Sequence, residues 1–156
     1  MPSTSPRGWP RRGRGFERWR RPVPHVFEYA VLRVIPRIER GECVNVGVLV
    51  YSAPLNFLKA AVHLDEARLR ALDPTVDLAA VEAQLSSLRA VCAGGPAAGA
   101  AGTTTIGRRF RWLTAPRSTI IQAAPAHTGL TDDPERELAH LLRVLVLPPG
   151  EVARRP

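Results

Sequence analysis

The sequence predicts an α+β fold, in which a mostly antiparallel sheet of four to six strands is covered by two or three helices. Segments rich in β-branched and aromatic residues form one group early in the chain and a second group late in it. Segments with helical leucine spacing lie between the two groups, and one more closes the domain. Strands and helices therefore do not alternate strictly, which argues against a parallel βαβ arrangement.

Three strands are predicted in the first half of the chain. Residues 27–35 (FEYAVLRVI) and 43–51 (CVNVGVLVY) are separated by the charged segment 37–42, with Gly41 at its turn, so they are expected to form a hairpin. Pro36 ends the first strand because proline has no ladder donor. Both strands are apolar on their two faces, which favours a central place in the sheet. Residues 57–63 are the third predicted strand.

Helix signals follow this group of strands. Asp65 is a good N-cap and Pro74 ends a short helix, and a second helix begins after Asp77 with apolar residues at helical spacing. Gly94-Gly95 ends the second helix, and residues 94–105 are expected to form a surface loop. Later in the chain we expect strands at 106–112 and 118–123, a turn at Ala115-Pro116 and a helix that begins around Asp132-Asp133-Pro134.

The positive charge is concentrated at the N-terminus. The formal charge of the 156 residues is +8, and residues 1–24 supply +6 of it, with seven arginines against the single acid Glu17. The rest of the chain is nearly neutral, so the high isoelectric point does not make the folded part a nucleic-acid binder. We expect a disordered tail at 1–24, one globular domain at 25–150 and a short tail at 151–156.

The N-terminal tail has three open interpretations. Its arginines interleave with Trp9, Phe16 and Trp19, and such a segment can contact nucleic acid or a membrane by charge and stacking. It can equally be a tail without a partner. Alternatively, translation starts at Val23 or Val26, and residues 1–22 are absent from the native protein.

Several classes of protein are disfavoured. No apolar run is long enough to span a membrane and no secretory signal is present, so the expected location is the cytoplasm. The four histidines and two cysteines share no metal-ligand spacing, and no phosphate-loop motif occurs, so neither a metal nor a cofactor is predicted. Cys43 and Cys92 are expected to be buried free thiols, with a disulfide or a catalytic thiol as alternatives.

Three long strings resemble a known family. Residues 29–51 (YAVLRVIPRIERGECVNVGVLVY), 64–74 (LDEARLRALDP) and 109–130 (RFRWLTAPRSTIIQAAPAHTGL) are similar to the bacterial family called domain of unknown function 3037. The resemblance covers roughly residues 27–147 and implies little chemistry, since the name of the family leaves its function open. It does suggest a HipA-like kinase as a partner, because members are often encoded beside one.

The residues that can bind a ligand form two sets. Arg117, Ser118 and Thr119 follow a proline-containing turn and can cradle a phosphate or carboxylate, although an ion pair and turn caps would explain them as well. Arg37, Arg40 and Asn45 lie around the first hairpin. The arginines there can pair with nearby acids, and Asn45 can mark a bulge or aim its amide at a ligand. Arg109 and Arg111 would share one face of the predicted strand 106–112.

His127 is the candidate for acid–base chemistry, because it is expected in a loop beside Thr128 and Gly129. A structural histidine is the alternative. The leading functional hypothesis is a non-enzymatic regulatory or adaptor protein that binds an anionic ligand or a protein partner. An enzyme acting on a phosphate-containing or nucleic-acid substrate is the second hypothesis, and it requires His127, Arg117 and either Arg37 or Arg40 to meet in one pocket. A nucleic-acid binder that works through residues 1–24 is the third.

Overall fold

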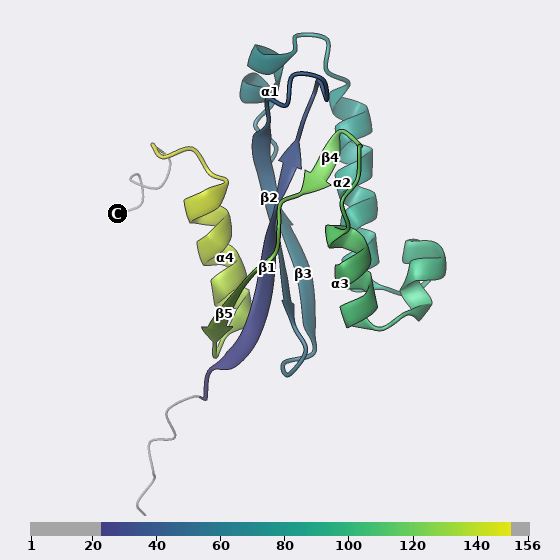
Figure 1. Ribbon diagram of the computed structural model, residues 1–156, viewed down its shortest axis with the longest axis vertical. Coiled ribbons are helices and arrows are strands. Elements are labelled where there is room, and N and C mark those ends of the chain that lie inside the picture. The colour runs from purple at the N-terminus through teal and green to yellow at the C-terminus, as the bar shows by residue number, and fades with distance from the viewer. Residues whose placement is uncertain (1–22, 151–156) are drawn as a thin grey trace, which may run out of the picture.

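The computed structural model describes residues 23–150 and confirms the α+β class (Figure 1). Within this range the sheet has five strands, every ladder is antiparallel, and four α-helices and one 3-10 helix accompany it. The elements in chain order are β1 (His25–Val34), β2 (Val44–Ser52), β3 (Phe57–Val62), α1 (Glu66–Leu72), α2 (Leu78–Ala93), η1 (Pro96–Thr103), α3 (Ile106–Thr114), β4 (Ile121–Ala123), β5 (His127–Thr131) and α4 (Pro134–Leu145).

The first two strands occupy the centre of the sheet, as their apolar character predicts. The strand order is β3-β2-β1-β4, and β5 also pairs with β1. The two late strands share one edge of β1: β4 pairs with its C-terminal end at Leu32 to Val34, and β5 pairs with its N-terminal half at His25 to Tyr29. Strand β1 is therefore the element that places the late segment of the chain.

The sheet is covered on both faces (Figure 1). Leu32 and Val34 of β1 belong to the larger core cluster, which packs against α1, α2 and α3. Phe27 of β1 and Val48 of β2 belong to the second cluster, which packs against α4. This division follows from strand geometry, because alternate side chains point to opposite faces of a sheet.

Three helices begin at caps that the sequence predicts. The carboxylates of Asp65, Asp77 and Asp133 accept hydrogen bonds from backbone N–H groups at the start of α1, α2 and α4. A carboxylate at this position satisfies an N–H group that has no partner inside the helix and favours the positive end of the helix dipole. Gly94 caps the C-terminal end of α2, as expected.

The predicted strand at 106–112 is wrong, because this segment forms helix α3. The hydroxyl of Thr105 caps the helix by accepting from the N–H of Arg108 at 3.3 Å. Ile106, Phe110 and Leu113 pack against the core at the spacing of one helical face. Arg109 and Arg111 consequently do not share a face. Arg109 is buried, whereas the exposed Arg111 forms two hydrogen bonds with Glu28 of β1.

The remaining differences concern short segments. The strand expected at 118–123 is shorter in the structure and consists of β4 alone. Strand β5 was not expected, and His127 is its first residue rather than part of a loop. The expected loop 94–105 contains η1, which has no buried residue. Cys43 is exposed and precedes β2, which corrects the prediction of a buried thiol in a strand. Cys92 is buried in α2, and this burial raises the pKa of its thiol to about 12.

The predictions for the two tails lie outside the described residues. They include the disordered N-terminal tail, of which only residues 23 and 24 are described, and its contact with nucleic acid. They also include the alternative translation starts that would remove residues 1–22, and the short tail at 151–156. They remain predictions. Among the helices of residues 23–150, none combines the length and apolarity needed to cross a membrane.

Candidate functional site

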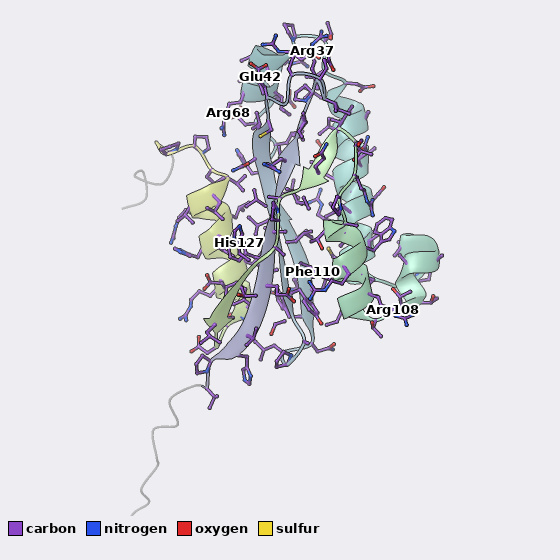
Figure 2. The ribbon with its side chains drawn as sticks, in the orientation of Figure 1. Arg37, Glu42, Arg68, Arg108, Phe110 and His127 are labelled. Atoms are coloured by element: carbon purple, nitrogen blue, oxygen red, sulfur yellow. The ribbon has the colours of Figure 1, made fainter. Side chains whose placement is uncertain are left out.

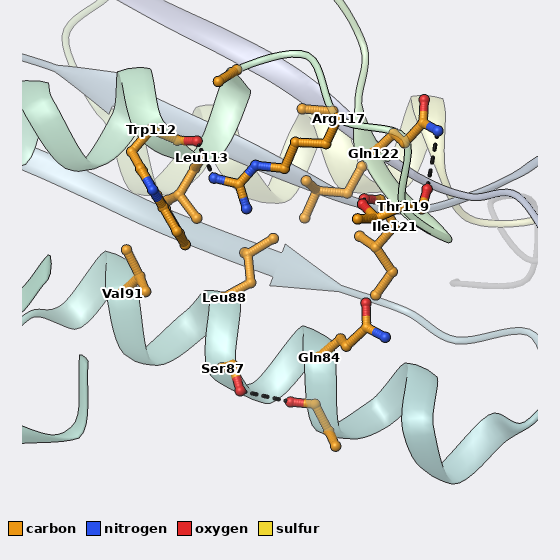
Figure 3. A pocket seen from close by; sticks show the side chains of 14 residues that line it. Gln84, Ser87, Leu88, Val91, Trp112, Leu113, Arg117, Thr119, Ile121 and Gln122 are labelled. Carbon is orange, nitrogen blue, oxygen red and sulfur yellow. Dashed lines mark hydrogen bonds between the residues drawn. The ribbon is translucent and has the colours of Figure 1, made fainter. Parts of the chain in front are cut away.

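A cavity of about 340 Å³ opens between α2, the C-terminal half of α3 and β4 (Figure 3). We call it the Arg117 cavity. Helix α2 contributes one face to it, because residues three, four and seven positions apart lie above one another on a helix. The sheet supplies apolar residues on the opposite wall. The lining residues are Leu32, Ala83, Gln84, Ser87, Leu88, Val91, Trp112, Leu113, Ala115, Arg117, Thr119, Ile121, Gln122 and Ala123.

The position of the Arg117 side chain is fixed by Trp112. The Cζ atom of Arg117 lies 3.9 Å from the centre of the Trp112 ring, and Nη2 donates a 2.6 Å hydrogen bond to the carbonyl of Trp112. A guanidinium over an indole face is stabilised by the ring quadrupole. No carboxylate of residues 23–150 forms an ion pair with Arg117. The cavity therefore carries an unneutralised positive charge beside a half-exposed aromatic ring.

The two hydroxyls predicted beside Arg117 do not behave alike. Thr119 lines the cavity, but its hydroxyl donates to the carbonyl of Ile121 at 2.7 Å. The amide of Gln122 in turn donates to the carbonyl of Thr119 at 3.0 Å. Ser118 is exposed and does not line the cavity. The structure thus brings Arg117 and Thr119 together and leaves Ser118 outside.

The arginines of the β1–β2 connection lie elsewhere and are paired with acids. Arg37 lies at the end of the molecule next to α1, together with Glu42 (Figure 2). Its Nε is 3.5 Å from a carboxylate oxygen of Asp73, and Arg40 forms two hydrogen bonds with Glu42 at 2.8 and 2.9 Å. Arg40 lowers the pKa of Glu42, first through a hydrogen bond. This geometry agrees with the structural alternative for both arginines.

Asp73 is the buried acid of this region, and its side chain is 9% exposed. The hydroxyl and the backbone N–H of Thr75 both donate to it, at 2.7 and 2.9 Å. These hydrogen bonds, followed by the charge of Arg37, hold the pKa of Asp73 below its usual value. The carboxylate thus serves to fix the turn between α1 and α2.

Asn45 marks a β-bulge, which is one of the two predicted alternatives. Leu32 pairs with Gly47 and Arg33 pairs with Asn45, so Val46 has no partner on β1. The Asn45 amide donates a 2.9 Å hydrogen bond to the carbonyl of Leu145 at the end of α4. A free carbonyl at a helix end needs such a donor. Asn45 therefore fixes α4 on the sheet.

His127 lies on the face of the sheet that α4 covers, away from the Arg117 cavity. It pairs with Tyr29 across the β1–β5 ladder, and the centres of the two rings are 5.3 Å apart. Tyr29 packs with the α4 cluster, whereas the Arg117 cavity opens on the α2 and α3 side. Figure 2 shows His127 on the α4 side of the sheet. The structure does not bring His127 and Arg117 together, nor either of them with Arg37 or Arg40.

The comparison with family models identifies the chain. The model described as "Protein of unknown function (DUF3037)" matches residues 29–146. The chain belongs to this family. Curated proteins and solved structures yield no significant match. The DUF3037 match runs from β1 to the residue that caps α4, and therefore includes every residue that lines the Arg117 cavity.

The sequence pattern of this DUF3037 protein predicts few of the residues that line the Arg117 cavity. Gln84 and Ser87 lie on α2 beside its core residues, and the apolar spacing of that helix indicates only the core residues. Trp112 would not flank Arg117 if residues 106–112 formed the predicted strand. The helical spacing of Ile106, Phe110 and Leu113 is the signal that indicates α3. Within residues 23–150, no group of three or more His, Cys, Asp or Glu side chains could hold a metal ion.

Proposed function

We propose that this DUF3037 protein is a non-enzymatic regulatory or adaptor protein. In this proposal the Arg117 cavity binds a protein partner that inserts an apolar side chain next to a carboxylate. The cavity volume of about 340 Å³ lies within the range of ligand pockets. The observation that carries the proposal is the composition of the walls, which are mostly apolar with one guanidinium at the edge.

The charge balance of the cavity favours an acidic group in the partner. Arg117 is the only charged residue among those that line the cavity. Its guanidinium is held by Trp112 and has no acidic partner in the part of the chain that the structure describes. A carboxylate placed there would gain charge-assisted hydrogen bonds. The half-exposed ring of Trp112 offers contact area to the neighbouring apolar group, as aromatic residues do at interfaces.

Geometry supports binding over catalysis at this position. No histidine, cysteine, lysine, aspartate or glutamate of residues 23–150 lines the Arg117 cavity. General acid–base catalysis needs such a group within hydrogen-bond reach of the substrate. The enzyme hypothesis relied on His127 beside Arg117, and these two residues lie on opposite faces of the sheet. The third hypothesis concerns residues 1–24, which lie almost wholly outside the described range.

A HipA-like kinase is the first partner to test, because the family resemblance suggests it. The kinase encoded nearest to the gene is co-expressed with the full chain, and the affinity is measured by biolayer interferometry. Ser87→Tyr fills the cavity, and Arg117→Gln removes its charge. Each change is expected to weaken the complex at least tenfold, or about 1.4 kcal/mol.

Ser86→Tyr is the matched control, since Ser86 is an exposed neighbour on α2 that does not line the cavity. It should leave the affinity unchanged. If the kinase does not bind the unaltered protein, a photo-crosslinker at position 87 can be used in native cells, with position 86 as the reference. Equal capture at the two positions would contradict the proposed use of the cavity.

A further inference from the structure

A second cavity, of about 490 Å³, lies along the edge strand β3, between it, the C-terminal end of α2 and the start of α3. We call it the Arg109 cavity. No residue lines both cavities, so binding at the Arg109 cavity does not depend on the function proposed for the Arg117 cavity. The residues that line the Arg109 cavity are Asn56, Phe57, Leu58, Lys59, Ala60, Arg89, Cys92, Ala93, Ile106 and Arg109.

The charged residues of this lining all have the same sign. Lys59, Arg89 and Arg109 come from three different elements, and the lining contains no aspartate or glutamate. Lys59 forms an ion pair with Glu135 of α4, which lies on the other face of the sheet, so its charge does not face the cavity. Neither arginine has an ion-pair partner among residues 23–150. Arg89 and Arg109 are like charges beside one cavity and repel each other, and a bound anion would relieve this repulsion.

Arg109 is the most unusual of the three, because its residue is only 8% exposed. Its Nη1 donates one long hydrogen bond, 3.3 Å, to the carbonyl of Thr104. Its Nε is buried and has no hydrogen-bond partner in the described part of the chain, residues 23–150. A buried guanidinium without a counter-charge is costly, since desolvation of the charge is not offset. Proteins generally pair such groups or use them to bind a ligand.

The backbone around Arg109 compensates for only part of this cost. Its guanidinium lies against Gly94, at the C-terminal end of α2, where helix carbonyls favour a positive charge. That interaction is smaller than the penalty for burying an ion. The helix end therefore explains the position of the side chain but not the Nε donor, which has no hydrogen-bond partner among residues 23–150.

We propose that the Arg109 cavity is an anion-binding site for a phosphorylated small molecule, with Arg109 at its base and Arg89 at its edge. Guanidinium groups bind phosphate through paired hydrogen bonds, and a phosphate monoester carries the multiple negative charge that matches two guanidinium groups. Leu58 and Ile106 supply apolar walls for the remainder of the molecule. The thiol of Cys92 is neutral at physiological pH because burial raises its pKa to about 12, so the site binds rather than reacts through this group.

The test is calorimetric titration of the full chain with inorganic phosphate and pyrophosphate at constant ionic strength. Arg89 is exposed, so Arg89→Gln can be made without disturbing the core. Arg108→Gln is the matched control, because Arg108 neighbours Arg109 on α3 but is exposed and does not line the cavity (Figure 2). The arginine-rich N-terminus is identical in both variants, so any anion that it binds does not affect the comparison.

We expect pyrophosphate to bind the unaltered protein, and Arg89→Gln to weaken this binding about tenfold. Arg109→Met should abolish cavity binding, whereas Arg108→Gln should change the affinity less than twofold. The proposal is overturned if pyrophosphate fails to bind, or if Arg89→Gln and Arg108→Gln reduce the affinity equally. Should Arg109→Met fail to fold, the comparison of Arg89→Gln with Arg108→Gln still decides the matter.

Discussion

Replacing Gly94 by alanine should destabilise the protein through two separable effects. Gly94 has φ +76° and ψ −168°, a backbone conformation that is essentially restricted to glycine. A methyl group built there would lie 2.3 Å from Nη1 of Arg109 and 3.0 Å from its Cζ. Both atoms belong to a buried side chain, so the guanidinium has to move away from α2 to make room.

The size of each effect can be worked out separately. The unfavourable backbone conformation costs about 1–3 kcal/mol. Displacing the guanidinium breaks its hydrogen bond to Thr104, and a bond from a charged donor contributes about 1.5–3 kcal/mol. Gly94→Ala should therefore lower the free energy of unfolding by roughly 2.5–6 kcal/mol.

Gly95 provides an internal control for the backbone part. Its φ of +79° and ψ of −167° are nearly those of Gly94, but a methyl group there would meet nothing within 4 Å. Gly95→Ala should therefore show the backbone cost alone. Urea denaturation followed by circular dichroism gives both free energies, with an unchanged m-value as the check on two-state unfolding.

A double variant decides whether Arg109 causes the difference. In an Arg109→Met background, Gly94→Ala should cost no more than Gly95→Ala, because the charged group that it displaces is gone. Equal costs for the two glycine replacements in the unaltered protein would refute the reasoning. So would a difference that persists without Arg109.

Three further predictions concern the core, the thiols and pH. Phe110→Ala should lower the free energy of unfolding by about 3–5 kcal/mol, whereas Trp112→Ala, at a residue that is 51% exposed, should lower it much less. If residues 106–112 formed a strand, the two side chains would share a face and the two changes would lower it equally. Urea denaturation of both variants distinguishes the helix from the strand. With a thiol reagent at pH 8 the folded protein should react at Cys43 alone, and Cys92 should react only after unfolding. Peptide mass mapping identifies the modified cysteine, and prompt modification of Cys92 would contradict its burial. Because the pKa of Asp73 is lowered in the folded state, its contribution to stability is complete above its unfolded-state pKa of 3.8 and is lost as the pH falls through the lower folded-state value. Asp73→Asn should therefore reduce the fall in melting temperature as the pH is lowered through this range. An unchanged dependence of the melting temperature on pH would contradict this prediction.

Short-range signals in the sequence were sufficient for most of the helices. An aspartate cap is a contact between residues three positions apart, so the starts of α1, α2 and α4 could be recognised without knowledge of the fold. The central strands were also recognisable, because a strand covered on both faces has to be apolar on both faces. The antiparallel sheet followed from the hairpin that these strands form.

Helix α3 and strand β5 could not be decided in the same way. Phe110 and Trp112 fit an alternating pattern, and Phe110 and Leu113 fit a helical one, so the segment was ambiguous. It is a helix because packing against Tyr51, with ring centres 5.0 Å apart, buries Phe110 completely. Strand β5 has little apolar pattern of its own and exists through its ladder with β1.

By itself the sequence determined the α+β class, the central hairpin and the capped helices, because these depend on residues close together along the chain. Within residues 23–150, only the tertiary structure decided which arginines have no acidic partner. It paired Arg37 and Arg40 with carboxylates, held Arg117 over Trp112 and buried Arg109 beside a cavity. The physical reason is that a charge is neutralised by whatever lies near it in space, and residues far apart in the sequence supply that neighbour.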